Sequence, residues 1–246
     1  NIKVNDANKE QYSEINLLYE TLILKYNQNR ALVPIIIDYA RFLCFEQGNS
    51  VEATSILKEK LKISYPITSV AQIKLALGDI LVYQERFDEA LIYYTQVQLS
   101  LKNSPIAQEA RFRVAKTSFY KGDFKWAETQ LKVLKSSISQ LIANDALELK
   151  LVISDHKYED SLQVALNAFS KASLLQFQKK TTKAIEVLSN ITENHKEEAI
   201  VDDAIFKMGS IYETQKKYDK AIENYTKIIE EFKESILLDD AYYRLG

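Results

Sequence analysis

The feature that most constrains the fold of this chain is a short pattern that occurs twice, 37 residues apart, in residues 202–209 and 239–246. Both copies begin with Asp-Asp-Ala and end with Gly. Between them, aromatic residues stand three positions before and four positions after Ala221, so all three residues share one helix face. A fixed period of about 20 to 50 residues is the mark of stacked supersecondary units. The pattern therefore predicts a helical solenoid.

Small residues repeat at the same spacing along most of the chain. In the predicted second helices of the hairpins they are 37 residues apart, except across the middle, at Ala53, Ala90, Ala127, Ala184 and Ala221. In the predicted first helices the corresponding positions are Gly78, Ala115, Ala172, Gly209 and Gly246. The two helices of a hairpin cross closely at these points, and a larger side chain would overpack there at a cost of about 1 to 3 kcal/mol.

The middle of the chain breaks this period, because Ala115 and Ala172 are 57 residues apart. The excess is enough for one more helix and a turn, and residues 139–154 have the amphipathic pattern of a helix, followed by a polar loop at 155–160. We therefore predict a run of hairpins over residues 1–136, an irregular unit with the extra helix and loop over 137–163, and a second run over 164–246 whose last repeat is truncated.

The composition supports an all-α fold. Gly and Pro are scarce, with 5 and 3 residues, so few positions interrupt a helix, and 46% apolar residues suffice for a continuous core. The predicted architecture is a right-handed α-solenoid of about thirteen helices with no strand. We expect the final helix to expose Tyr242, Tyr243 and Leu245, because no second helix follows Gly246.

The sequence argues against several classes of function. The net charge is −2 and the charges are interleaved, which does not suit a nucleic-acid backbone. The longest apolar runs, such as residues 31–37, are far shorter than the ~20 residues of a membrane span. Cys44 is the single cysteine and is expected to be a buried small hydrophobe. The chain opens on Asn1 without a leader sequence, so a fragment or a processed form is expected.

No pattern of catalytic or metal-binding residues is present. His156 and His195 are 39 residues apart in predicted polar connections, and a solvated loop is a better interpretation than a metal site. Phosphate-binding loops and nucleophile motifs are missing, so we predict no enzyme activity, no metal and no cofactor. Trp126 and Met208 are interpreted as packing residues rather than binding residues.

These positions resemble the tetratricopeptide repeat family, whose helix-turn-helix unit is typically about 34 residues long. The signature positions are occupied by Leu77-Gly78, Leu81, Phe87, Ala90 and Tyr94, and again by Met208-Gly209, Tyr212, Tyr218, Ala221 and Tyr225. The usual Gly is replaced by Arg41 and Ala172 in two repeats. The resemblance implies a non-enzymatic scaffold that binds a partner protein or peptide in a concave groove.

Within the family, one subset grips a chaperone's C-terminal carboxylate with Lys and Asn on successive first helices. The equivalent positions here are Leu75 with Asp79, Phe112 with Lys116, and Phe206 with Ser210, so that clamp is absent. Aromatic residues at positions that face the concave surface in this family suggest a peptide groove instead. The residues expected to bind a partner are Leu75, Asp79, Tyr83, Phe112, Lys116, Phe119, Tyr120, Phe206 and Ser210.

The repeat length and the sequence from Phe232 through Ser235 to Asp240-Ala241-Tyr242 look most like repeats of bacterial envelope proteins, such as the outer-membrane assembly lipoproteins and the Tol–Pal coordinator. This resemblance implies a periplasmic or outer-membrane-associated scaffold. The alternative is a peptide-sensing regulatory domain of a cytoplasmic signalling or transcription protein. A signal sequence with a lipid-acceptor Cys, or a fused effector, would separate the two hypotheses.

Overall fold

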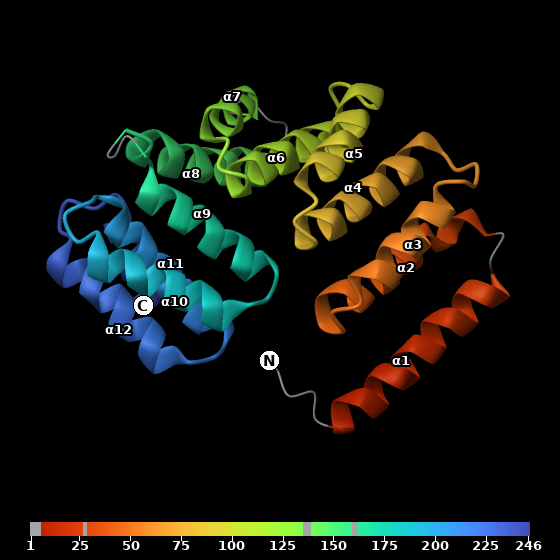
Figure 1. Cartoon of the computed structure of the whole chain (residues 1–246), viewed down its shortest axis with the longest axis horizontal. Coiled ribbons are helices and arrows are strands. Elements are labelled where there is room, and N and C mark those ends of the chain that lie inside the picture. The colour runs from red at the N-terminus through yellow and green to blue at the C-terminus, as the bar shows by residue number, and fades with distance from the viewer. Residues whose placement is uncertain (1–5, 27–28, 135–138, 159–161) are drawn as a thin grey trace. The chain divides into compact units, whose positions relative to one another are not determined.

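The computed structural model describes residues 6–26, 29–134, 139–158 and 162–246, and over these residues it contains thirteen α-helices and no strand (Figure 1). The predicted all-helical fold of consecutive hairpins is confirmed. The chain divides into two compact units, residues 1–114 and 115–246, with the boundary inside α6 (Pro105–Tyr120). The grouping of the repeats into runs ending at residues 136 and 163 is a different division and stays a prediction.

Unit 1 is a series of helices in which each packs on the next. It begins with α1 (Asp6–Lys25), η1 (Arg30–Leu32), α2 (Val33–Arg41) and a π-helical continuation, η2 (Phe42–Glu46). These are followed by α3 (Ser50–Lys60), α4 (Ile67–Tyr83), α5 (Phe87–Ser100) and the first part of α6. Contacts run from α1 to α2, α2 to α3, α3 to α4 and α4 to α5, as expected for an array whose units touch only their neighbours.

Unit 2 contains the end of α6 and seven further helices: α7 (Phe124–Leu134), α8 (Gln140–His156), α9 (Val164–Phe177), α10 (Thr181–Asn194), α11 (Ile200–Thr214), α12 (Tyr218–Glu231) and α13 (Leu238–Leu245). The hairpins α9–α10 and α11–α12 follow each other directly (Figure 1). The extra helix predicted near residues 139–154 is α8, which packs on α7 and also contacts α11. It continues to His156, so the predicted loop begins later than expected.

The predicted small residues lie where the helices of each hairpin meet. All five alanines of the second helices are buried, with exposed fractions of 0 to 2%. Gly78 and Gly209 lie against tyrosine rings: a Cβ on Gly78 would lie 2.3 Å from Tyr94, and one on Gly209 would lie 2.6 Å from Tyr225. No side chain could be added at either glycine without moving the ring. The 37-residue register predicted from the sequence is thus confirmed by packing.

Five hairpins in the described part of the chain turn through a residue in the left-handed region. This residue comes seven positions after the small residue of the first helix or, in the α2–α3 hairpin, after Arg41. The φ angles are +72° at Gly48, +60° at Glu85, +83° at Gly122, +58° at Lys179 and +58° at Lys216. This conformation ends the first helix sharply and starts the second one antiparallel to it. Three of the five turns adopt it without glycine, which indicates that packing of the two helices imposes the turn.

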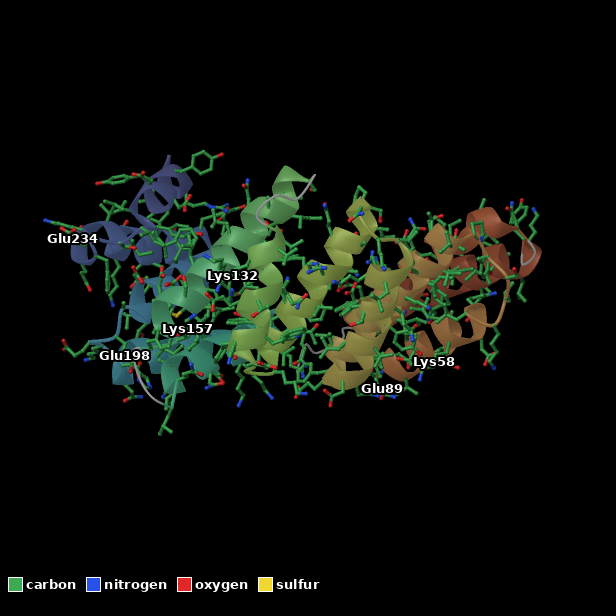
Figure 2. The ribbon with its side chains drawn as sticks, turned by 90° about the horizontal axis from the view of Figure 1, so that it is seen from above. Lys58, Glu89, Lys132, Lys157, Glu198 and Glu234 are labelled. Atoms are coloured by element: carbon green, nitrogen blue, oxygen red, sulfur yellow. The ribbon has the colours of Figure 1, made fainter. Side chains whose placement is uncertain are left out.

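Ion pairs join helices on the surface of each unit. In unit 1, Lys58 of α3 lies 4.0 Å from Glu89 of α5, and the two labelled side chains are neighbours in Figure 2. In unit 2, Glu128 of α7 is buried and pairs with both Lys132 of its own helix and Lys157 at the end of α8. The bond from Lys157 is the main reason that the pKa of Glu128 is lowered. This pairing fastens the additional helix to α7.

The structure also tests the predictions of burial and exposure made for single residues. Cys44 is fully buried as predicted, and burial followed by the charge of Asp79 raises the pKa of its thiol to about 12. Met208 is also buried. Trp126 of α7 is not a core residue, because 49% of it is exposed. At the C-terminal helix, Tyr242, Tyr243 and Leu245 are exposed as expected.

Candidate functional site

The predicted partner-binding residues of unit 1 are mostly engaged in internal contacts. Leu75 is buried in α4. Asp79 accepts hydrogen bonds from Tyr94 at 2.8 Å and from Arg113 at 2.8 Å. Tyr83 packs edge-on against Phe45, with 5.3 Å between the ring centroids. Phe112 of α6 is half-buried. Leu75 is therefore out of reach of a partner, and Asp79 holds neighbouring helices together.

In unit 2, the predicted residues divide between core and surface. Phe119 is only 2% exposed and packs 5.7 Å from the ring of Phe124, so it belongs to the core of the α6–α7 hairpin. Tyr120 of α6 remains half-buried, with its ring 6.0 Å from Phe177 of α9. The other three, Lys116, Phe206 and Ser210, are half-buried on first helices. Their partner-binding role stays a prediction.

The structure adds a largely charged group of residues, of which the sequence analysis singled out only Lys116. We call it the Lys207 cluster and define it as Lys116 of α6, Glu148 of α8, Phe169 of α9, and Asp203 and Lys207 of α11. The ammonium of Lys207 lies 5.2 Å from the centroid of the Phe169 ring, in a cation–π contact. Four helices of unit 2 therefore contribute to one site, and none of the four is the second helix of a hairpin.

Lys207 is the electrostatic centre of this cluster. Its side chain keeps part of its surface open to water, yet protein surrounds the ammonium closely, and this burial is the main cause that lowers its pKa to about 8. The charge of Glu148 opposes the shift, Lys116 increases it, and Asp203 opposes it. No residue in the described parts of the chain offers Lys207 a hydrogen-bond acceptor or an ion-pair partner within bonding distance.

The carboxylates around Lys207 are also perturbed. Burial is the main cause that raises the pKa of Glu148, and the negative charges of Asp145, Asp240 and Asp203 add to it. Burial likewise raises the pKa of Asp203, although its hydrogen bond with His156 opposes the shift. Burial and neighbouring charges thus shift the pKa values of Glu148, Asp203 and Lys207 in one part of unit 2.

His156 corrects the prediction of a solvated loop. It lies in the last turn of α8, only 4% exposed, and its Nε2 is 2.7 Å from Oδ2 of Asp203 on α11. The two residues are 47 positions apart in the sequence, so their contact joins α8 to α11. His195, by contrast, follows α10 in a connection as predicted and is 2.6 Å from Glu198. His156 therefore contacts the Lys207 cluster through the carboxylate of Asp203.

Sequence reasoning missed Glu148, His156, Asp203 and Lys207 for one reason. The extra helix α8 has no counterpart in the other repeats, so periodicity says nothing about what its side chains face. A signal was available for Asp203 and Lys207, because they recur as Asp240 and Arg244 in the second copy of the repeated pattern.

The described residues show neither a metal-binding group nor a membrane helix. In these parts of the chain no three His, Cys, Asp or Glu residues are grouped so that they could hold a metal ion. Among the helices observed, none combines the length and the apolar character that crossing a bilayer requires. The chemistry that the Lys207 cluster offers is recognition of a charged or hydrogen-bonding group.

Comparison with known proteins agrees with this fold. Residues 203–235 match the family model described as Tetratricopeptide repeat. The chain contains a tetratricopeptide repeat. Over these residues, which cover most of α11 and all of α12, the tetratricopeptide resemblance inferred from the sequence is confirmed.

Among solved structures, the chain is similar to the crystal structure of a tetratricopeptide repeat protein from Parabacteroides merdae, with 13% sequence identity and a TM-score of 0.46. The alignment covers 97% of this chain and 93% of the other. A search among curated proteins found no match. Tetratricopeptide repeats are generally protein-interaction scaffolds and are typically not enzymes, so a protein is the expected kind of partner.

Proposed function

We propose that this tetratricopeptide repeat protein is a non-enzymatic scaffold that holds a partner protein or peptide on the Lys207 cluster of unit 2. The observation that carries the proposal is the ammonium of Lys207, which is enclosed by charged groups yet has no acceptor among the described residues. A partner that supplies an acceptor would complete its hydrogen bonding. Charge-assisted hydrogen bonds in such a confined place are stronger than those in bulk water.

The half-buried aromatic residues of the same unit support this location. Tyr120, four residues after Lys116 on α6, forms a ring pair with Phe177, and the half-buried Phe206 of α11 packs 5.3 Å from the ring of Tyr225. Aromatic residues contribute a large part of the binding energy at protein interfaces. A partner that contacts both the rings and the ammonium would gain apolar contact and a charged anchor together.

Lys207 is also unfavourable for folding, which argues for a role other than stability. Its lowered pKa means that the folded protein disfavours the charged form relative to the unfolded chain. Residues that reduce stability at a site are often retained for binding. Replacement by Met keeps the length of the side chain and removes the charge.

The test is site-specific photo-crosslinking in cells that express the native protein. A photoreactive residue at Ser210, three positions from Lys207, should capture a discrete partner, whereas one at the exposed Ile222 on α12 should not. Adding Lys207→Met should reduce the crosslink several-fold, and the matched change Lys183→Met on α10 should leave it unaltered. Equal crosslinking at positions 210 and 222, or no effect of Lys207→Met, would refute the proposal.

We further propose that this scaffold works in the bacterial envelope. The proposal rests on the repeat length and on the sequence between Phe232 and Tyr242, which resemble envelope repeats. Cell fractionation with the full reading frame tests it directly. A periplasmic or outer-membrane fraction, with a leader that carries a lipid-acceptor Cys, is the expected result. A cytoplasmic fraction with a fused effector module would favour the peptide-sensing regulatory domain instead.

A further inference from the structure

Glutamine recurs at one position of the repeat, six residues after the small residue of the first helix. In the first of these repeats, Arg41 occupies the position of the small residue. The four members are Gln47, Gln84, Gln178 and Gln215. Each stands directly before the left-handed residue of the hairpin turn. At this place a side-chain amide can reach the second helix of the preceding repeat and the start of its own second helix.

In the earlier repeats these amides have partners within the protein. Gln47 exchanges hydrogen bonds with Asn16 of α1, at 2.9 and 3.4 Å. The amide nitrogen of Gln84 donates to the carbonyl of Ser50 at 2.9 Å and to the hydroxyl of Thr54 at 3.1 Å, both on α3.

The oxygens of two of these amides are bound by the cation two residues later. Oε1 of Gln84 accepts from Arg86 at 3.2 Å, and Oε1 of Gln178 accepts from Lys180 at 2.9 Å. The same contact therefore closes the turn in two different repeats.

Gln215 departs from this arrangement. Its Oε1 is buried and has no hydrogen-bond partner among the residues described. In the repeat alignment, Ile185 stands where Gln84 finds Thr54, so the preceding helix offers no hydroxyl. Lys217 stands where Arg86 and Lys180 stand, but no hydrogen bond joins it to Gln215. A buried acceptor without a donor loses the hydrogen bonds that it made to water in the unfolded chain, which is a reason to look for its partner outside the fold.

Gln215 lines a pocket of about 480 Å³ between α10 and the α11–α12 hairpin. One wall is acidic and amidic, with Glu186, Asn190 and Glu193 of α10. The opposite wall carries Lys217 and Lys220, and the Lys220 ammonium lies 5.3 Å from the centroid of the Tyr212 ring. The described structure shows no ion pair between the two walls.

We propose that this pocket is a second binding site of the protein, which takes an extended peptide segment bearing an acidic side chain. A main-chain N–H of the segment donates to Oε1 of Gln215, and the acidic side chain pairs with Lys217 and Lys220. Charge complementarity favours this occupant, because Lys217 and Lys220 line the same pocket as Oε1 of Gln215, the one buried side-chain oxygen without a hydrogen-bond partner in the described residues. The volume is in the range of pockets that hold small ligands or a few peptide residues. The site shares no residue with the Lys207 cluster.

The experiment is an NMR titration of the isotope-labelled chain with blocked tripeptides in the millimolar range. The probe is acetyl-Gly-Glu-Gly-amide, and its matched controls are the neutral Gln tripeptide and the cationic Lys tripeptide. Saturable shifts are expected at the backbone amides of Lys217 and Lys220 and at the side-chain amide of Gln215. The neutral tripeptide should bind at least about tenfold more weakly, because it lacks the charge-assisted hydrogen bonds.

Two variants decide between this proposal and an internal partner for Gln215. Combined replacement of Lys217 and Lys220 by Met should abolish the acidic tripeptide's shifts, and Lys180→Met in the preceding repeat should leave them intact. The contrary outcome is that Lys217→Met shifts the NMR signals of the Gln215 side-chain amide, whereas none of the three tripeptides shifts them. Lys217 then closes this turn as Lys180 closes its own, and the proposal is overturned. Equal shifts with all three tripeptides would also overturn it.

Discussion

The hairpins α4–α5 and α11–α12 differ from the hairpins α6–α7 and α9–α10 in how their helices meet. In the first pair, a glycine of the first helix lies under a tyrosine that stands 16 residues later, Tyr94 over Gly78 and Tyr225 over Gly209. In the second pair, the same two positions hold alanine and leucine: Ala115 with Leu131, and Ala172 with Leu188, all four buried. A small residue with a large partner and a medium residue with a medium partner fill similar volumes.

The tyrosine hairpins carry a polar connection that the leucine hairpins lack. The Tyr94 hydroxyl donates to Asp79, which also accepts from Arg113, and the Tyr225 hydroxyl donates to Glu213, which also accepts from Arg244. Each arginine lies on the next first helix, 35 residues after its glycine. The glycine thus admits a tyrosine whose hydroxyl helps to hold a carboxylate for the following repeat.

This difference explains why Lys207 has no acceptor. It occupies the same repeat position as Arg113 and Arg244, but the hairpin before it is of the leucine type. Where Asp79 and Glu213 provide carboxylates, α9 has Ser173 and Gln176. A cation that elsewhere ties two repeats together is therefore left available here, and the candidate site arises from a missing internal partner.

The largest expected effect is on the glycine that admits the ring. Gly78→Ala should destabilise the protein by about 1 to 3 kcal/mol, because the new methyl would lie 2.3 Å from the Tyr94 ring. Adding Tyr94→Leu converts the hairpin to the other type and should recover part of the loss. Chemical denaturation of both single variants and the double variant measures this coupling. Purely additive effects would show that the two kinds of hairpin are not equivalent solutions.

A smaller effect is expected from the hydroxyl groups. Tyr94→Phe should lower stability by about 1 to 2 kcal/mol, since Asp79 is mostly buried and loses a donor. Tyr225→Phe should lower it by less than about 1 kcal/mol, because 38% of the Glu213 side chain is exposed to water. Denaturation of the two variants under the same conditions gives the ranking. The reverse ranking would contradict the role assigned to burial.

Both kinds of hairpin have a left-handed residue in the turn. Introducing a glycine there and removing one should change stability in opposite directions. Glu85→Gly is expected to stabilise the chain by up to about 1 kcal/mol, because it relieves a left-handed conformation at φ +60°. Gly122→Ala at φ +83° should destabilise it by about 1 kcal/mol. Thermal melts of both variants test this expectation. Loss of stability in Glu85→Gly would mean that the glutamate side chain contributes more than the strain.

The smallest effect on stability is expected from supplying the missing acceptor. Gln176 stands four residues after Ala172, as Glu213 stands four residues after Gly209, so Gln176→Glu should pair with Lys207. The gain should lie between about 0 and 1 kcal/mol for a partly exposed pair. If Lys207 binds the partner, the same variant should weaken the crosslink from Ser210. A crosslink that persists with a stabilised protein would separate the lysine from binding.

The pH dependence of stability sharpens the same comparison. The pKa of Lys207 is lowered from 10.5 to about 8, so between these values the unfolded chain binds more protons than the folded protein. Stability should therefore gain a contribution as pH rises from about 8 to 10.5. Lys207→Met should remove this contribution, and Gln176→Glu should reduce it, because a paired ammonium keeps its proton to higher pH. Denaturation curves across this window provide the measurement.

The sequence alone determined the all-helical hairpins, their 37-residue register and the position of the additional helix. These features depend on contacts within a hairpin or between consecutive repeats. Such contacts require Gly, Ala and aromatic residues at short, regular spacings in the sequence. For the same reason Met208 and the exposed residues of α13 were placed correctly. Trp126 was not, because an apolar residue at helical spacing can face either side.

Only the tertiary structure decided which polar residues share a site. Glu148, His156 and Lys207 come from α8 and α11, two helices that are brought together across the α9–α10 hairpin between them. Leu75 and Phe119 were expected on a binding surface and are buried instead, since a position within the repeat does not state how far neighbouring side chains cover it. Burial and charge interactions between residues far apart in the sequence depend on which helices meet in space. An inserted helix has no counterpart in the other repeats, so sequence periodicity cannot predict which helices it contacts.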